Sequence, residues 1–206
     1  MNQKIKKKVN KIYKKKNYKI ILNKNKMNRC LIFFSGNGIF FPDTIEEFNK
    51  TIEIRDRYEW EQISKDVNAK KVIFMRDIKK NWYQKGISRK INNINKIILL
   101  LKKETKKFPE IVLIGSSAGG YLASVVGNYL KKAYVINFAG QVDLIFEGLK
   151  LKNKKYQNIS RKMKNSTIFY FFSNKNKNDL IHYNLIRKNN NIKFFKFDSN
   201  IHGPAV

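Results

Sequence analysis

The sequence is poor in the residues that build disulfide frameworks and metal centres. Its 206 residues include one cysteine, Cys30, and two histidines, His182 and His202. A single cysteine excludes an internal disulfide framework and a cysteine-based zinc site, and two histidines leave little for any other metal site. We therefore expect neither a metal ion nor an organic cofactor.

Other absences narrow the class of protein further. Three prolines and ten glycines are too few for a collagen-like or proline-rich chain. No apolar run approaches the ~20 residues of a membrane-spanning helix, and the longest runs, at 97–101 and 168–172, are short. Hydrophobic residues nevertheless make up 42% of the chain and aromatic residues 13%, which is enough to bury a core.

Acidic residues are scarce, because 15 Asp and Glu stand against 44 Lys and Arg and give a formal net charge of +29. Lysine, asparagine and isoleucine are all abundant, as an A/T-rich coding genome would produce, so the charge requires no polyanionic partner. A protein this basic still adheres to nucleic acid or anionic membrane at low salt. We interpret such contacts as non-specific.

The first 29 residues differ from the rest in charge. They carry twelve basic residues and no acidic one. Ile5, Val9 and Ile12 fall near helical spacing, so this basic arm is either a weakly amphipathic helix or a solvated tail. No apolar core of a signal peptide follows the basic stretch, and we expect a cytoplasmic protein. The sequence thus predicts a basic arm at 1–29 and a separate folded domain at 30–206.

From residue 30 onward, buried strands alternate with helices. Continuous apolar runs typical of buried strands lie at 30–35, 71–75, 111–114, 133–138, 167–173 and 192–197. Helical patterns lie at 44–48, 88–107 (with Ser88 as the cap), 121–130 and 179–188, and a short edge strand is expected at 18–22. This order predicts an α/β fold, a three-layer sandwich with a mainly parallel sheet of about six strands. Ligands of such sheets bind beyond the carboxyl ends of the strands.

One motif at such a strand end carries chemistry. The residues Gly115-Ser-Ser117-Ala-Gly119 form a G-x-S-x-G pattern directly after a buried strand and before a helix. In this pattern the serine occupies a sharp turn, and the small residues on either side let strand and helix approach closely. The N–H of Ala118, at the start of the helix, is suited to donate to an oxyanion. We therefore predict Ser117 as a nucleophile.

On this motif the chain resembles the α/β-hydrolase superfamily, whose catalytic residues follow in the order serine, acid, histidine. Asp179 follows the strand at 167–173, and His202 follows the strand at 192–197. The resemblance implies that Ser117 attacks an acyl carbon, that His202 takes the serine proton and later returns it to the leaving group, and that Asp179 orients the imidazole.

Alternatives exist for the acid and the histidine. His182 is the only other histidine, and it lies three residues after Asp179, which suggests a surface or helix-capping position. Asp143, which follows the strand at 133–138, and Asp198 are the other candidates for the acid.

The remaining site residues are assigned by their place after a strand. The resemblance implies a second oxyanion donor in the turn after an early strand, where the backbone N–H of Gly36 or Asn37 is available. The sequence of this turn departs from the H-G pattern common in the superfamily, so the choice between the two stays open. Asp77 and Gln141 are the residues we assign to the substrate pocket, with a structural role as the alternative for Asp77.

The predicted function is that of a serine hydrolase that cleaves an ester or thioester through an acyl-enzyme intermediate. The substrate would be a small-molecule or carrier-linked acyl compound. Only residues 139–166 separate the fourth buried strand from the fifth, so we expect a small lid and an open site. The alternatives are an acyltransferase with the same triad, and a catalytically inert basic protein whose arm binds nucleic acid or anionic membrane.

Overall fold

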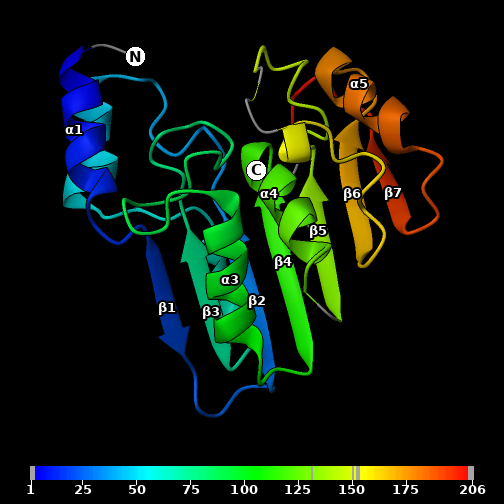
Figure 1. The fold of residues 1–206 in the computed structure, drawn as a ribbon, viewed down its shortest axis with the longest axis horizontal. Helices are drawn as coiled ribbons and strands as arrows, with labels where there is room; N and C mark the ends of the chain where they lie inside the picture. Colours follow the sequence, from blue (N-terminus) through cyan, green and yellow to red (C-terminus); the bar gives the residue numbers. More distant parts are fainter. Residues whose placement is uncertain (1–2, 131, 150, 152–153, 204–206) are drawn as a thin grey trace. The chain divides into compact units, whose positions relative to one another are not determined.

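The computed structural model describes residues 3–130, 132–149, 151 and 154–203. The chain divides into two compact units, residues 1–109 and 110–206 (Figure 1), whereas the sequence placed a boundary at residue 29. The first two residues of the predicted arm, and three residues of the predicted 139–166 lid segment, lie outside the described residues. None of the described helices is long and apolar enough to cross a membrane.

The first unit contains three strands, β1 (Tyr18–Leu22), β2 (Arg29–Phe34) and β3 (Lys71–Met75). β2 runs parallel to β3, and β1 runs antiparallel to β3 as the predicted edge strand. β3 is buried along its whole length, and β2 is buried except at its first residue. The helices of this unit are α1 (Gln3–Tyr13), α2 (Ile45–Phe48) and α3 (Ile94–Thr105), with short helical turns at Asn49–Ile54 and Ile63–Asp66.

The basic arm contains the helix α1. Ile5, Val9 and Ile12 share one face of it, are at most 5% exposed, and pack in one apolar cluster with Phe48 and Ile52. The lysines of this helix lie off that face, and Lys4, Lys6, Lys7 and Lys11 are exposed. Of the two alternatives that the sequence left open, the amphipathic helix is therefore the one observed, and it forms part of the core of the first unit.

The helix α3 begins later than predicted. Its N-cap is Asn93, whose side-chain oxygen accepts the N–H of Lys96 at 2.9 Å. Ser88, the predicted cap, instead accepts a backbone N–H in a turn that precedes the helix. Both residue types cap helices well, so the local pattern did not distinguish the two positions.

Asp77 organises the loop that follows β3. Its side chain is completely buried, and its carboxylate accepts the backbone N–H groups of Lys79 at 3.0 Å, Asn81 at 2.7 Å and Tyr83 at 2.8 Å. Burial raises the pKa of Asp77 to about 6, and the backbone hydrogen bonds oppose this shift. The predicted substrate contact of Asp77 is not supported, because its oxygens are taken up by the loop; the structural alternative fits.

Replacing Asp77 by Ala would leave three N–H groups of the loop, one buried and two partly buried, without their acceptor. We expect the free energy of unfolding to fall by about 2–4 kcal/mol, measured by urea denaturation. An unchanged midpoint and slope would show that the loop does not depend on this carboxylate.

The pH dependence of stability provides a second test of the same group. Because the pKa of Asp77 rises from 3.8 to about 6 on folding, the folded state holds the proton longer than the unfolded state. The stability of the wild type, taken relative to Asp77→Asn, should therefore fall as the pH rises from about 4 to about 6 and be level above pH 6. A difference that stays constant over this range would contradict the raised pKa.

The second unit contains four parallel strands that are neighbours in chain order. They are β4 (Glu110–Ser116), β5 (Ala133–Phe138), β6 (Thr167–Ser173) and β7 (Ile192–Phe197). Its helices are α4 (Ala118–Gly127), α5 (Lys177–Ile186) and the short turn at Lys154–Tyr156. The mainly parallel α/β fold is thereby confirmed. The loops that follow β4, β5, β6 and β7 leave the same edge of the sheet.

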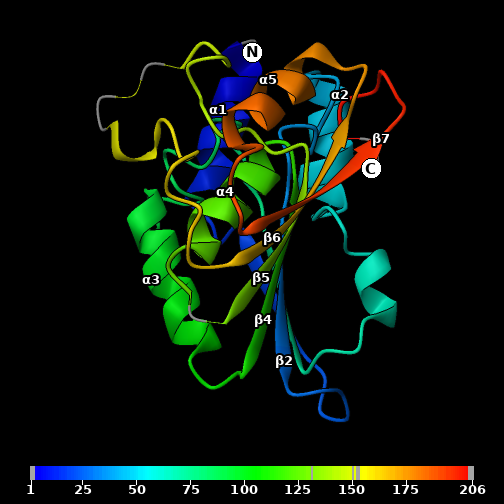
Figure 2. The same ribbon diagram turned by 90° about the vertical axis from the view of Figure 1, so that its right-hand side faces the viewer.

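The two faces of these four strands differ in burial. Val135 and Phe172 face the helices α4 and α5, and Phe172 stacks on Tyr183 of α5 with ring centroids 4.3 Å apart. Figure 2 shows α4 and α5 on the same side of the strands. On the opposite face, Phe171 stacks on Phe195 at 4.6 Å, and Phe195 stays 41% exposed.

Candidate active site

Ser117 occupies a strained turn between β4 and α4. Its φ of 52° and ψ of −120° are unfavourable for a residue with a β-carbon. The turn is held by backbone hydrogen bonds on both sides. The N–H of Ser117 donates to the carbonyl of Phe138 in β5 at 2.9 Å, and its carbonyl accepts the N–H of Tyr121 in α4 at 3.0 Å. Strain of this kind, imposed by the surrounding structure, is typical of a nucleophile turn.

The small residues around Ser117 have the steric purpose that the sequence predicts. A β-carbon on Gly115 would lie 2.3 Å from the carbonyl carbon of Gly119, in the backbone of α4. No side chain fits there without moving the helix away from the strand.

The Gly115→Ala variant should therefore lose about 1–3 kcal/mol of unfolding free energy because the added methyl group overpacks the turn. Gly38→Ala is the matched control, since a β-carbon at Gly38 meets nothing closer than a Glu59 oxygen at 4.0 Å. Thermal unfolding of both variants compares them. Equal loss of stability in the two would contradict the steric role of Gly115.

Asp179 and His202 form a hydrogen-bonded pair. Asp179 lies in the first turn of α5 and is completely buried. Its Oδ1 lies 2.5 Å from Nδ1 of His202, and its Oδ2 accepts the backbone N–H of Ser173 at 2.9 Å. A carboxylate accepts only, so this contact assigns the proton to Nδ1 of His202. The Nε2 atom is then the imidazole nitrogen available to take a proton.

The loop that carries His202 is attached to β6 and α5. The hydroxyl of Ser173 donates to the carbonyl of Ile201, and the amide of Asn176 donates to the carbonyl of Asn200 at 3.0 Å. The side chain of His202 remains 33% exposed. The imidazole is thus oriented by Asp179 on its Nδ1 side and is partly exposed to solvent.

The same loop approaches the turn at Ser117. Gly203 has a φ of 62°, and a β-carbon there would come within 3.0 Å of the Ser116 hydroxyl. The residue after His202 therefore lies against the residue before Ser117. Ser117 at the turn after β4, Asp179 in the first turn of α5 and His202 in the loop after β7 thus lie at one edge of the second unit.

Gln141 contacts Ser117 directly. It is 2% exposed, and its Nε2 donates to Oγ of Ser117 at 3.1 Å. The turn that precedes it is fixed by Asn137, which donates to the carbonyl of Gly120 at 3.0 Å and accepts the N–H of Gly140 at 2.6 Å. The sequence placed Gln141 at the pocket but did not predict a contact with the serine.

His182 is a buried residue, and its predicted position at the surface is wrong. Its Nδ1 accepts the backbone N–H of Val142 at 3.4 Å, and its Nε2 lies 3.2 Å from Oε1 of Glu147. These partners assign the Nε2–H tautomer. The hydrogen bond from His182 is the main cause that lowers the pKa of Glu147, although burial opposes it. No local pattern relates two residues 35 positions apart, so this pair was not predictable from the sequence.

The alternative acids are engaged elsewhere. The carboxylate of Asp143 accepts from the amide of Asn158 at 2.6 Å and closes the loop after β5. Asp198 is exposed and pairs with Lys175 at 2.8 Å, a contact that also lowers the pKa of Asp198. Asp179 is thus the candidate acid that meets a histidine.

The predicted oxyanion donors differ in their burial and in their hydrogen-bond partners. Ala118 is buried as the first residue of α4. In the first unit, the N–H of Gly36 donates to the carboxylate of Glu59 at 2.6 Å, and burial raises the pKa of Glu59. Gly36 would act as a donor to substrate only if Glu59 gave way. Asn37 is the other candidate, and its side-chain oxygen is buried without a hydrogen-bond partner among the described residues.

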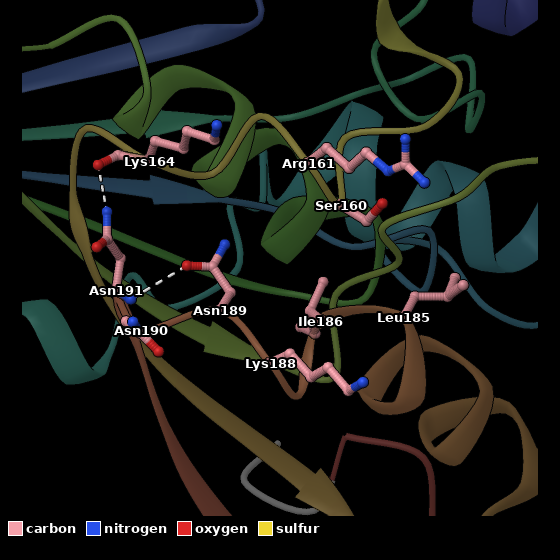
Figure 3. A pocket seen from close by; sticks show the side chains of 9 residues that line it. All are labelled: Ser160, Arg161, Lys164, Leu185, Ile186, Lys188, Asn189, Asn190 and Asn191. Atoms are coloured by element: carbon pink, nitrogen blue, oxygen red, sulfur yellow. Dashed lines mark hydrogen bonds between the residues drawn. The ribbon is translucent and has the colours of Figure 1, made fainter.

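A cavity of about 540 Å³ in the second unit lies apart from these residues (Figure 3). It is formed by the end of α5, the loop that follows it and the loop before β6, and Arg161, Lys164 and Lys188 line it. The cavity contains none of the predicted catalytic residues. Within the described part of the chain, no group of three or more His, Cys, Asp or Glu side chains is arranged to hold a metal ion.

Comparison with solved structures identifies the class of fold. Neighbours that cover most of this chain include esterases, a lipase-esterase related protein and an O-acetyltransferase. The chain therefore has the α/β-hydrolase fold, as the resemblance of its sequence implied.

Three of these neighbours define the degree of similarity. The lipase-esterase related protein from Clostridium acetobutylicum is 16% identical, with 90% of this chain and 91% of that chain covered and a TM-score of 0.56. A capsule O-acetyltransferase variant of Neisseria meningitidis serogroup A, in complex with CoA, is 15% identical, with 92% and 87% covered and a TM-score of 0.60. Esterase B from Lactobacillus rhamnosis is 10% identical, with 89% and 76% covered and a TM-score of 0.53. No family model and no curated protein matches the sequence.

Proposed function

We propose that this protein is a serine hydrolase that cleaves an ester or thioester through an acyl-enzyme intermediate. The observation that carries the proposal is the hydrogen bond between the buried Asp179 and His202. Gly203, the residue after His202, lies against the turn that carries Ser117. The acyl compound would be a small molecule or a carrier-linked group.

In this mechanism, Oγ of Ser117 attacks the acyl carbon while Nε2 of His202 takes its proton. The N–H of Ala118 would stabilise the negative charge on the former carbonyl oxygen. His202 then gives the proton to the leaving alcohol or thiol. Water, deprotonated by the same Nε2, attacks the acyl-enzyme, and Ser117 is released with its proton restored. Asp179 keeps the Nδ1 proton in place and stabilises the imidazolium.

Acyl transfer is the second candidate function. The observation that favours it is the similarity to the O-acetyltransferase whose structure contains CoA. The chemistry of the first half-reaction is the same, and an alcohol replaces water in the second.

Covalent labelling with a fluorophosphonate probe tests the nucleophile. We expect the wild type to be labelled and Ser117→Ala to be unlabelled, and we expect His202→Ala to react at least a thousandfold more slowly because the serine loses its base. Ser116→Ala, with correct folding checked by circular dichroism, is the control for a neighbouring serine and should still be labelled. Labelling of Ser117→Ala at the wild-type rate would refute the proposal.

Product analysis separates the two reactions. Incubation with an activated acetyl ester and with acetyl-CoA, each with and without a sugar alcohol acceptor, measures the ratio of acetate to acetylated acceptor. Hydrolysis predicts acetate at an unchanged rate when the acceptor is added. A rate that rises with the acceptor, with acetylated acceptor as the main product, would identify a transferase.

A further inference from the structure

The contact between Gln141 and Ser117 has a defined polarity. An amide nitrogen has hydrogens to donate and no lone pair to accept with, so in the contact at 3.1 Å the Oγ atom of Ser117 is the acceptor. A serine hydroxyl has a single hydrogen. With Gln141 as the donor, that hydrogen is left for another acceptor.

We propose that Gln141 is a positioning residue for the nucleophile, a role that rests on the proposed function. Its amide holds Oγ of Ser117 in one rotamer and leaves the hydroxyl proton to be given to Nε2 of His202. The same N–H remains on Oγ when the acyl-enzyme breaks down. There it stabilises the charge that develops on Oγ as the bond to the acyl carbon breaks, before His202 returns the proton.

The surroundings of Gln141 fix the amide in place. It is 2% exposed, and the preceding turn is attached to α4 through Asn137. A side chain held this way has lost its rotamer freedom on folding, so its hydrogen bond needs no further ordering when substrate binds.

A second attachment links Gln141 to the helix that carries Asp179. The N–H of Val142, the next residue, donates to the buried ring of His182 in α5. His182 in turn meets Glu147, which also accepts from the amide of Asn178, the neighbour of Asp179. The partner of the serine and the partner of the imidazole therefore belong to one hydrogen-bonded framework. This gives the contact of the buried His182 with the partly buried Glu147 a role that the proposed triad alone does not explain.

The test uses the isosteric substitution Gln141→Glu. An ionised carboxylate can only accept, so it would draw the Ser117 proton away from His202, whereas the protonated acid can still donate. We expect kcat to fall at least tenfold at neutral pH with KM changed less than threefold. The ratio of variant to wild-type kcat should rise as the pH is lowered. Gln141→Leu should show the loss of kcat without this pH dependence of the ratio.

The matched control is Gln157→Glu, the same substitution at another buried glutamine of this unit, whose amide donates to the carbonyl of Leu149. It should leave kcat and its pH profile at the wild-type form. Thermal unfolding of all three variants separates loss of folding from loss of rate.

The outcomes distinguish the two proposals. A Gln141→Glu variant with wild-type kcat at neutral pH overturns the positioning role and leaves the proposal that Ser117 is the nucleophile standing. A variant that changes KM alone has the same consequence, and it would support the substrate contact that the sequence predicted for Gln141. A pH profile that Gln157→Glu reproduces also overturns it. A wild type that is not labelled at Ser117 overturns the proposed function and this role with it.

Discussion

The site depends on the burial of one carboxylate. Asp179 is removed from water at the start of α5, and a buried carboxylate without partners costs several kcal/mol. One of its oxygens is satisfied by the end of β6 and the other by the imidazole of His202. Satisfying this carboxylate therefore attaches the loop after β7 to the strand and helix before it, and the geometry of the site follows from that requirement.

The sequence predicted those parts of the site that local patterns determine. The turn at Ser117 was recognisable because small residues must stand at fixed spacings around it, and Asp179 and His202 because each follows a buried strand in the order that the superfamily keeps. Contacts between distant segments were not predictable in this way. His182 is paired with Glu147, 35 residues earlier in the chain, and Gln141 reaches Ser117 from the turn after β5. Neither contact produces a periodic pattern in the sequence.

Carboxylates are scarce in this chain, with 15 against 44 cationic side chains, and several of them serve the backbone rather than the lysines. Asp77 accepts three N–H groups of its own loop, Glu59 accepts the N–H of Gly36, and Asp179 accepts that of Ser173. Reading charge alone would pair such residues with lysine. Burial instead favours short contacts with backbone donors, which explains why Asp77, predicted for the pocket, organises a loop.

The choice between hydrolysis and transfer does not lie in the proposed triad, since both reactions would use the same proton movements. It depends on whether water reaches the acyl-enzyme before an alcohol does. The side chain of His202 is 33% exposed, so solvent reaches the imidazole that would activate the acceptor in the proposed mechanism. A transferase built on this site would have to bind its alcohol tightly enough to exclude that water. We infer that, without such an acceptor site, hydrolysis is the reaction that this arrangement favours.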